Sequence, residues 1–127
     1  MWKPKFDKEK EGLIPVVTIC SKTGVVLMVA SMNREAYEET IRTGKVVYYS
    51  RSRKELWYKG KGSGHEQEVV EIRTNCNEDS LQISVQQHRA ACHDGYYSCY
   101  YRLVTDDGLK VVEERIFDPN QQAKGEN

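Results

Sequence analysis

The sequence predicts a single strand-dominated α+β domain with one or two short helices. Three observations lead to this prediction. Most apolar residues fall in short runs rich in valine, isoleucine and tyrosine, which is typical of strands. Glycines and turn-forming residues separate these runs. The chain has 127 residues, a length that fits one domain with its own core. We expect that core at about 12–117 and a polar tail at 118–127.

The first elements expected are a hairpin and a helix. The apolar runs GLIPVVTIC (12–20) and VVLMVASM (25–32) are separated by SKTG, a turn sequence, and therefore predict two hairpin strands. NREAYEETIRTG (33–44) predicts a short helix. Asn33 is a suitable N-cap, acidic residues come early, and Gly44 is suited to end the helix.

The middle of the chain predicts three more strands. KVVYYSRS (45–52) is β-branched and aromatic, so it predicts a strand, and LWYKGKGSG (56–64) predicts entry into a glycine-rich loop. HEQEVVEIRTNC (65–76) and SLQISVQQ (80–87) predict two strands that are joined through the stretch TNCNED at 74–79.

The last third predicts a loop and a hairpin. RAACHDGYYSCYYR (89–102) has loop character in its middle, and YYRLVTDDGLKVVEERIF (100–117) predicts a hairpin with an Asp-Gly turn at 107–108. We find no repeat, linker or second domain, so residues 1–127 are expected to form one unit.

The charge balance narrows the class of protein. Lys and Arg number 19, and Asp and Glu number 19, so net charge gives no argument for a nucleic-acid or membrane partner. No apolar run approaches the roughly 20 residues of a membrane span. The stretch MWKPKFDKEKEG at 1–12 is too charged for a signal peptide. We expect a soluble, cytoplasmic protein.

Four cysteines are the first candidate functional residues. Without a secretion signal, they favour metal binding or chemistry over disulfides. Cys20 follows a buried-strand pattern and is interpreted as a small buried hydrophobe. Cys76, Cys92 and Cys99 lack the paired spacing of zinc fingers, so their spacing alone is weak evidence. Three thiolates nevertheless suit zinc and leave a fourth position for water, which zinc ionises near neutral pH.

Histidines are candidates for proton transfer. His65 follows a glycine-rich loop and His93 follows Cys92, so either could orient or shuttle a proton. A lone histidine is more often a surface or core residue, and that interpretation stays open for both. His88 lies among glutamines and an arginine, and we interpret it as structural or exposed.

The stretch SRSRKELWYKGKGSGHEQ (50–67) is a candidate phosphate-binding segment. On a strand, Arg51 and Arg53 would share one face, and nearby lysines would extend the positive charge. Trp57 could stack on a base or pack in the core. The alternative is a solvated basic face over a buried tryptophan. The full set of candidate substrate-binding residues is Arg51, Ser52, Arg53, Trp57 and Ser63, and the lysines are Lys54, Lys59 and Lys61.

Three segments together resemble a known family. They are VLMVASMNREAYEETIRTGKVVYYSRSRKELWYKGKGSGHEQ (26–67), EIRTNCNEDSL (71–81) and AACHDGYYSCYYR (90–102), in that order. They are similar to the phosphoribosyl-AMP cyclohydrolase family of histidine biosynthesis. The resemblance covers most of positions 12 to 102.

The resemblance implies an intertwined homodimer with active sites at its interface. It implies one zinc per subunit, held by Cys76, Cys92 and Cys99, one of which comes from the opposite subunit. It also implies hydrolytic opening of the adenine ring of phosphoribosyl-AMP between N1 and C6. Water activated by the zinc would attack C6, His65 or His93 would transfer protons, and the basic segment would hold the phosphates.

The chain departs from the family at TNCNED. The family carries Asp-Cys-Asp-x-Asp there, and the three aspartates hold magnesium. This chain has Asn75, Asn77 and Asp79 at those positions, so a magnesium site would be depleted and its affinity weakened. Glu78 would point to the other face if the segment were a strand. Two alternatives therefore stay open: a paralogue that hydrolyses a related purine nucleotide or ring compound with zinc alone, or a non-catalytic, zinc-stabilised nucleotide-binding dimer.

Overall fold

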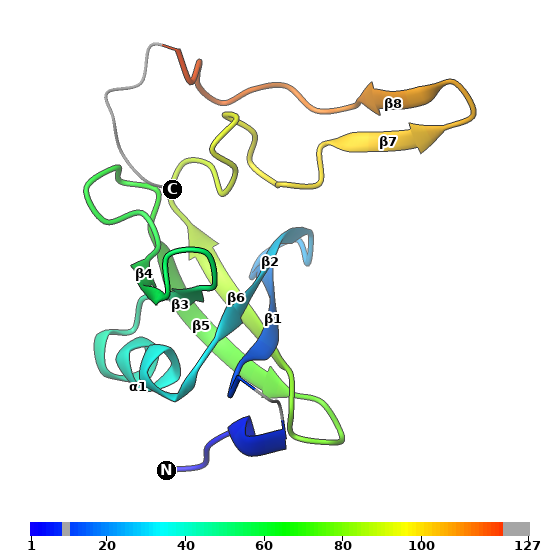
Figure 1. The fold of residues 1–127 in the computed structure, drawn as a ribbon. Helices are drawn as coiled ribbons and strands as arrows, with labels where there is room; N and C mark the ends of the chain where they lie inside the picture. The colour runs from blue at the N-terminus through cyan, green and yellow to red at the C-terminus, as the bar shows by residue number, and fades with distance from the viewer. Residues whose placement is uncertain (9–10, 121–127) are drawn as a thin grey trace.

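A four-stranded mixed sheet forms the body of the protein, in the order β2–β1–β6–β5 (Figure 1). The computed structural model describes residues 1–8 and 11–120. β1 pairs antiparallel with β2 and parallel with β6, and β6 pairs antiparallel with β5. The strand bounds are β1 Ile14–Cys20, β2 Val26–Met32, β5 Gln67–Thr74 and β6 Leu81–Gln87.

The predicted first hairpin and the two later strands are confirmed. β1 alternates between buried and more exposed residues, so Ile14, Val16 and Thr18 face the core. β6 is buried along most of its length because it lies between β1 and β5. The parallel pairing of β1 with β6 joins segments far apart in the chain, and no local pattern predicts it.

The predicted helix is confirmed with both of its caps. α1 spans Arg34–Thr43, and the Asn33 Oδ1 accepts a hydrogen bond from the Ala36 N–H at 2.9 Å. Gly44 ends the helix at φ +74°, and its N–H donates to the Thr40 carbonyl at 2.9 Å. A short 3₁₀ helix, η1 (Phe6–Lys8), precedes the sheet.

A second hairpin corrects two expectations. β3 (Val47–Ser50) is shorter than the predicted strand 45–52, and β4 (Glu55–Tyr58) lies where we expected entry into a loop. Residues 51–54 form the turn between them, with Lys54 at φ +54°. The premise that Arg51 and Arg53 share one strand face is therefore wrong.

The third hairpin, which we call the arm (residues 102–111), projects from the body (Figure 1). It consists of β7 (Arg102–Thr105) and β8 (Gly108–Val111), and all of its strand residues are exposed. The predicted hairpin is confirmed, but Thr105 pairs with Gly108. The two turn residues are therefore Asp106 and Asp107, one position earlier than expected.

Two further features bear on the sequence predictions. No helix among residues 1–8 and 11–120 is long and apolar enough to cross a membrane. Most of the predicted polar tail, residues 121–127, lies outside the described residues.

A run of buried hydrogen bonds crosses the core beneath these elements. The Tyr48 hydroxyl donates to the Gln67 Oε1 at 2.6 Å and contacts the Thr18 Oγ1 at 2.6 Å, so Thr18 is the donor in that contact. Gln67 donates to the Gln87 Oε1 at 2.8 Å, and the Gln87 Nε2 donates to the His65 carbonyl at 3.1 Å. The run therefore links β1, β3, β5 and β6 to the loop that carries His65.

Tyr48→Phe should lower the free energy of unfolding by about 1–3 kcal/mol, because it leaves the Thr18 hydroxyl and the Gln67 Oε1 buried without their partner. Urea unfolding monitored by circular dichroism measures this. Tyr49→Phe is the matched control, because the Tyr49 side chain is only half-buried, and it should change stability by less than about 0.5 kcal/mol. Equal effects of the two changes would contradict the role of the Tyr48 hydroxyl.

Candidate active site

Two of the predicted metal ligands lie together in the connection between β6 and β7. Cys92 begins a tight turn in which the Gly95 N–H donates to the Cys92 carbonyl at 3.0 Å and the Cys92 N–H donates to the Tyr96 carbonyl at 3.1 Å. The Cys99 N–H donates to the Leu27 carbonyl of β2 at 2.8 Å. The Cys92 thiol lies close enough to the Cys99 thiol to raise the pKa of Cys99. We call them the thiol pair.

A buried ammonium group lies beside the thiol pair. Lys59 is 2 % exposed, and its Nζ donates to the Ala91 carbonyl at 2.9 Å. Desolvation lowers the pKa of Lys59 to about 8, and the two thiols oppose that shift. Desolvation and the neighbouring Cys92 raise the pKa of the Cys99 thiol to about 12, whereas Lys59 lowers it. A further positive charge at this point would favour the thiolate form, and two adjacent sulfur atoms suit a soft cation such as zinc.

Cys76 lies at the opposite end of β6 from the thiol pair. It is exposed, in the turn that joins β5 to β6, whereas Cys92 follows the far end of β6. The seven residues of β6 correspond to about 20 Å at roughly 3.3 Å per residue. Among residues 1–8 and 11–120, no three His, Cys, Asp or Glu side chains are grouped to hold a metal ion. One chain therefore brings together two of the three predicted zinc ligands.

His65 is fully buried next to this site. Its Nδ1 accepts a hydrogen bond from the Ala90 N–H at 3.1 Å, so the neutral ring carries its proton on Nε2. The Nε2 is buried without a hydrogen-bond partner among the described residues. Desolvation lowers the pKa of His65, with smaller contributions from the positive charges of Arg89 and Lys59. His65 is therefore a neutral hydrogen-bond donor at neutral pH.

A C-terminal segment that sequence reasoning missed covers His65. The Phe117 ring lies 4.9 Å from the His65 ring, centroid to centroid. The Ile116 N–H donates to the Gly95 carbonyl at 2.7 Å, and the Arg115 Nε donates to the Asp94 carbonyl at 2.9 Å. A Cβ at Gly95, where φ is +96°, would lie 2.2 Å from the Phe117 carbonyl oxygen. Phe117 therefore packs on the buried His65 ring and contributes to its exclusion from solvent.

The other two histidines differ from His65 in exposure. The His93 side chain is 85 % exposed, and its Nε2 lies 3.4 Å from the Asp94 Oδ1. The His88 Nε2 pairs with the Glu68 carboxylate on β5. Only His93, of these two, belongs to the turn that begins at Cys92.

The predicted phosphate-binding residues are divided between two places. Arg51, Ser52 and Arg53 lie in the β3–β4 turn, and Arg53 Nε is 3.9 Å from a Glu55 carboxylate oxygen. Ser63 lies in the next loop, where its Oγ accepts from the His65 N–H at 3.4 Å. The buried Lys59 is not part of an exposed positive cluster, contrary to our expectation.

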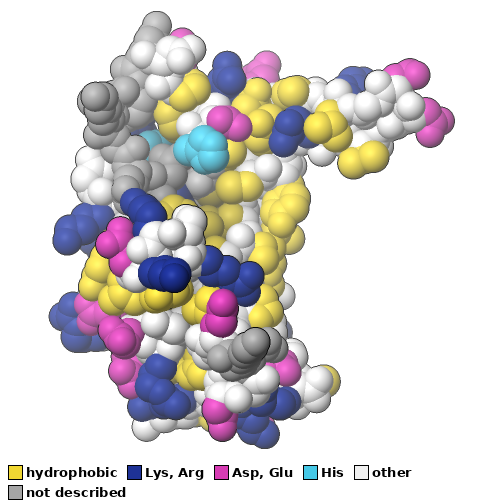
Figure 2. Space-filling model, in the orientation of Figure 1, with side chains coloured by type: hydrophobic (Ala, Val, Ile, Leu, Met, Phe, Trp, Pro, Cys, Tyr) yellow, Lys and Arg dark blue, Asp and Glu magenta, His cyan; other side chains and the backbone are white. Residues whose placement is uncertain are grey.

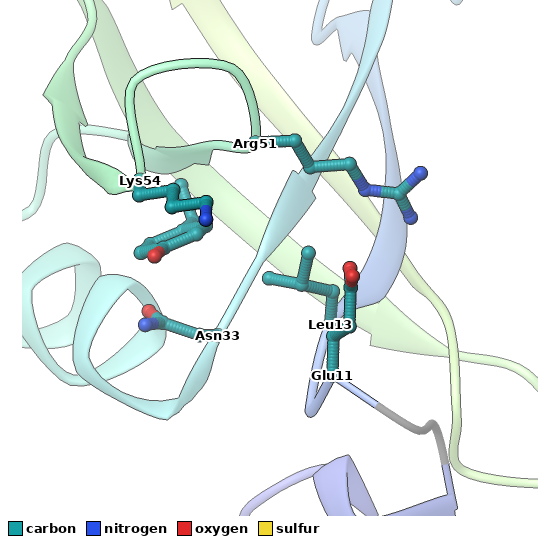
Figure 3. A pocket seen from close by; sticks show the side chains of 6 residues that line it. Glu11, Leu13, Asn33, Arg51 and Lys54 are labelled. Carbon is teal, nitrogen blue, oxygen red and sulfur yellow. The ribbon is translucent and has the colours of Figure 1, made fainter.

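A pocket of about 410 Å³ opens beside the β3–β4 turn (Figure 3). Figure 3 shows the Arg51 and Lys54 side chains extending from that turn toward the pocket. Two cations at one opening are suited to an anionic group such as phosphate. The pocket is lined by Glu11, Leu13, Asn33, Tyr49, Arg51 and Lys54.

Trp57 packs within the protein. Its ring lies 5.4 Å from the Tyr48 ring, and the Lys59 Nζ lies 5.8 Å from the centre of the indole. The indole Nε1 is buried without a hydrogen-bond partner among the described residues. The ring contributes to the core whether or not its N–H also meets a ligand.

Asn75, Asn77 and Asp79 lie in the β5–β6 turn, away from the thiol pair of the same chain. Glu78 is in the left-handed region at φ +60° within this turn, so the strand on which it would have pointed to the other face is not formed. Its carboxylate accepts a hydrogen bond from the Trp2 Nε1 at 2.9 Å.

The family model and the similar proteins described below carry the same name. The family model described as phosphoribosyl-AMP cyclohydrolase matches residues 28–101. A protein of that name from Pelotomaculum thermopropionicum is 51% identical over 111 residues, which cover 87% of this chain and 86% of the relative. Another from Rhodopseudomonas palustris is 50% identical over 123 residues, covering 92% and 82%. A third, from Desulfatibacillum aliphaticivorans, is 48% identical over 122 residues, covering 94% and 98%.

Gly95→Ala should raise the pKa of His65 toward its ordinary value, because the added Cβ would force Phe117 away and admit water to the ring. NMR titration of the histidine ring protons measures this, with His88 as an internal reference. Gly108→Ala is the matched control, since Gly108 also has a positive φ of +116° but has open space around it. An unchanged His65 titration in a folded Gly95→Ala variant would show that Phe117 does not control solvent access.

Proposed function

This chain belongs to the phosphoribosyl-AMP cyclohydrolase family, and we propose that it is a hydrolase that opens the adenine ring of phosphoribosyl-AMP between N1 and C6 in histidine biosynthesis. The observation that carries the proposal is the thiol pair with the buried Lys59 and His65 beside it. All four residues fall within the segment that matches the family.

Zinc is the metal that this donor set fits best. Cys92 and Cys99 would supply two thiolates, and the exposed Cys76 of a second subunit would supply the third. The length of β6 supports this division, because it keeps Cys76 of the same chain away from the thiol pair. When bound, zinc supplies a Lewis acid that lowers the pKa of water to near neutrality.

The protein's own groups have separate roles in the proposed reaction. A bond forms between the water oxygen and C6, the C6–N1 bond breaks, and N1 gains a proton. The His65 Nε2–H is a donor suited to hydrogen-bond the adenine ring, because its Nδ1 is already held by the Ala90 N–H. The exposed His93, paired with Asp94, is suited to accept the proton from water.

The β3–β4 turn provides the proposed phosphate contacts. Arg51 and Lys54 line the pocket of about 410 Å³, and the Ser52 hydroxyl lies in the same turn. Arg53 and Ser63 would extend this surface toward the His65 loop. Trp57 would support the segment from beneath through its packing on Tyr48.

The proposed division of the zinc ligands requires a homodimer, and the apolar surface of the arm supports one. Val104 and Leu109 form a cross-strand pair on one face of the arm and are 81% and 61% exposed. β2 is an edge strand of the main sheet, with Val26 and Val29 also exposed. Figure 2 shows hydrophobic side chains along the arm and along the edge of the body below it. Exposed apolar surface of this extent is typical of an interface between subunits.

Turnover of phosphoribosyl-AMP by the zinc-loaded protein tests the activity and the ligand set together. The wild type should form ring-opened product, measured by absorbance, with one zinc per subunit. Cys92→Ser should lose the zinc and more than about 100-fold in kcat/KM, since even residues that only support metal ligands are worth about 10- to 100-fold. Cys20→Ala is the control, because Cys20 is a buried core cysteine outside the proposed ligand set.

Each contrary result has a distinct meaning. Full zinc content in Cys92→Ser would remove Cys92 from the ligand set. No product from a zinc-loaded wild-type dimer would overturn the proposed substrate. In that case a related purine nucleotide becomes the substrate to test, and a binding function without turnover would follow if no ring-opened product formed from any of them.

Val104→Asp with Leu109→Asp should convert the dimer to monomers, because two carboxylates would be buried at the proposed interface. Sedimentation velocity measures the association state, and zinc content should fall with it. Val70→Asp is the matched control, since Val70 is 62% exposed on β5 at the opposite edge of the sheet. A double variant that remains dimeric and retains zinc would exclude the arm from the interface.

A further inference from the structure

The turn between β5 and β6 is held closed by its own hydrogen bonds. The Asn75 Oδ1 accepts from the Asp79 N–H at 3.0 Å and from the Ser80 N–H at 3.1 Å. The Asn75 Nδ2 donates to the Asp79 Oδ1 at 2.6 Å. Two backbone donors on one side and a carboxylate on the other fix the orientation of the amide. The Asn75 side chain therefore directs an N–H group, not an oxygen, at Asp79.

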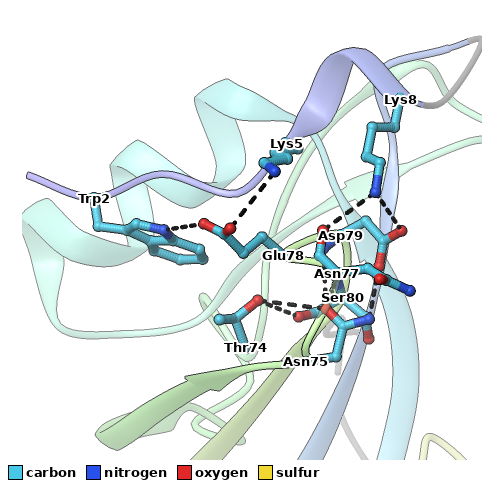
Figure 4. Close-up of polar contacts among 9 residues, drawn as sticks. All are labelled: Trp2, Lys5, Lys8, Thr74, Asn75, Asn77, Glu78, Asp79 and Ser80. Atoms are coloured by element: carbon cyan, nitrogen blue, oxygen red, sulfur yellow. Dashed lines mark hydrogen bonds and ion pairs between the residues drawn. The ribbon is translucent and has the colours of Figure 1, made fainter.

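The first eight residues of the chain pack onto this turn (Figure 4). The Lys5 N–H donates to the Glu78 carbonyl at 2.8 Å, and the Trp2 Nε1 donates to the Glu78 carboxylate at 2.9 Å. Phe6 is buried, and its ring lies 6.1 Å from that of Tyr37 on α1. The segment is therefore anchored at both the turn and the helix.

This anchoring brings the Lys8 ammonium group to the centre of the turn. The Lys8 Nζ donates to the Asn77 carbonyl at 3.2 Å and lies 3.4 Å from the Asp79 Oδ2 (Figure 4). A carboxylate and a backbone carbonyl are the oxygen types that bind hard divalent cations. Here a positively charged side chain contacts both of them.

The turn does not fit the magnesium ion that the family resemblance implies. One Asp79 oxygen accepts from Asn75 and the other contacts Lys8, so both are engaged by donors within the chain. The other acidic residue of the turn, Glu78, lies 3.5 Å from the Lys5 Nζ. Two negative side chains are thus matched by two lysines, and a divalent cation would have to compete with them.

We propose that the ammonium group of Lys8 takes the place of a divalent cation at the β5–β6 turn, and that this turn binds no magnesium in the folded protein. The first eight residues then position the Lys8 ammonium group so that it stabilises the conformation of the turn. Cys76 lies within the same turn, so its backbone is ordered by a lysine from the same chain.

Binding of Mn²⁺, a paramagnetic substitute for Mg²⁺, tests the proposal in the full-length zinc-loaded protein. Electron paramagnetic resonance of free Mn²⁺ gives the number of ions bound. The wild type and Asp79→Asn should bind Mn²⁺ equally. A triple variant, with Asn75→Asp, Asn77→Asp and Lys8→Met, should bind one additional ion. The double Asp variant, which has Asn75→Asp and Asn77→Asp but retains Lys8, should bind that ion at least about tenfold more weakly, because the ammonium group repels it.

Lys3→Met is the matched control for Lys8→Met. Lys3 belongs to the same segment and is equally exposed, but it pairs with Glu38 on α1 at 2.9 Å. When Lys3→Met is added to the double Asp variant, the Mn²⁺ affinity should not rise. Lys8→Arg, which keeps the positive charge, should also leave that affinity unchanged.

Two results would overturn the proposal. One is Mn²⁺ binding to the wild type that Asp79→Asn abolishes, a comparison that does not depend on how the multiple variants fold. The other is equal Mn²⁺ affinity of the double Asp variant with and without Lys8. Both readouts measure ion binding and not turnover, so they stand apart from any failure of the proposed activity.

Discussion

The buried hydrogen bonds that run from Thr18 to the His65 carbonyl determine how the sheet supports the candidate site. Gln87 determines which group donates and which accepts in each bond of the run. Its Nε2 donates to the carbonyls of both His65 and His88. A reversed Gln87 amide would direct its oxygen at two carbonyl oxygens. The Gln87 Oε1 must therefore accept from Gln67, which in turn must accept from Tyr48. The position of the His65 loop thus depends on polar residues of the core.

The elements that the sequence predicted correctly are those with local signals. Asn33 and Gly44 cap the helix, and SKTG makes the first turn. β4 was missed because its apolar residues merge into a glycine-rich stretch, and only pairing with β3 defines it as a strand. The parallel pairing of β1 with β6 has no local signature, since it depends on how the whole sheet assembles.

The candidate site could be predicted by residue type but not by arrangement. The resemblance, and not the spacing alone, made the cysteines and His65 candidates, whereas the burial of Lys59 and the packing of Phe117 on His65 depend on loops packing together. The contact between Lys8 and Asp79 joins residues 71 positions apart. The sequence showed only that the first residues are charged, and charge alone does not say where a lysine binds.

The close approach of Gly95 to the Phe117 carbonyl has an evolutionary consequence. Gly95 lies inside the segment that matches the family, residues 28–101, whereas Phe117 lies outside it. A side chain at position 95, already disfavoured by the positive φ, avoids a clash only in a background where the chain after the arm takes another path. The two regions are therefore expected to change together. In a relative that has lost the C-terminal cover, a side chain at position 95 meets only the strain of the positive φ, so the same substitution would be more deleterious here than there.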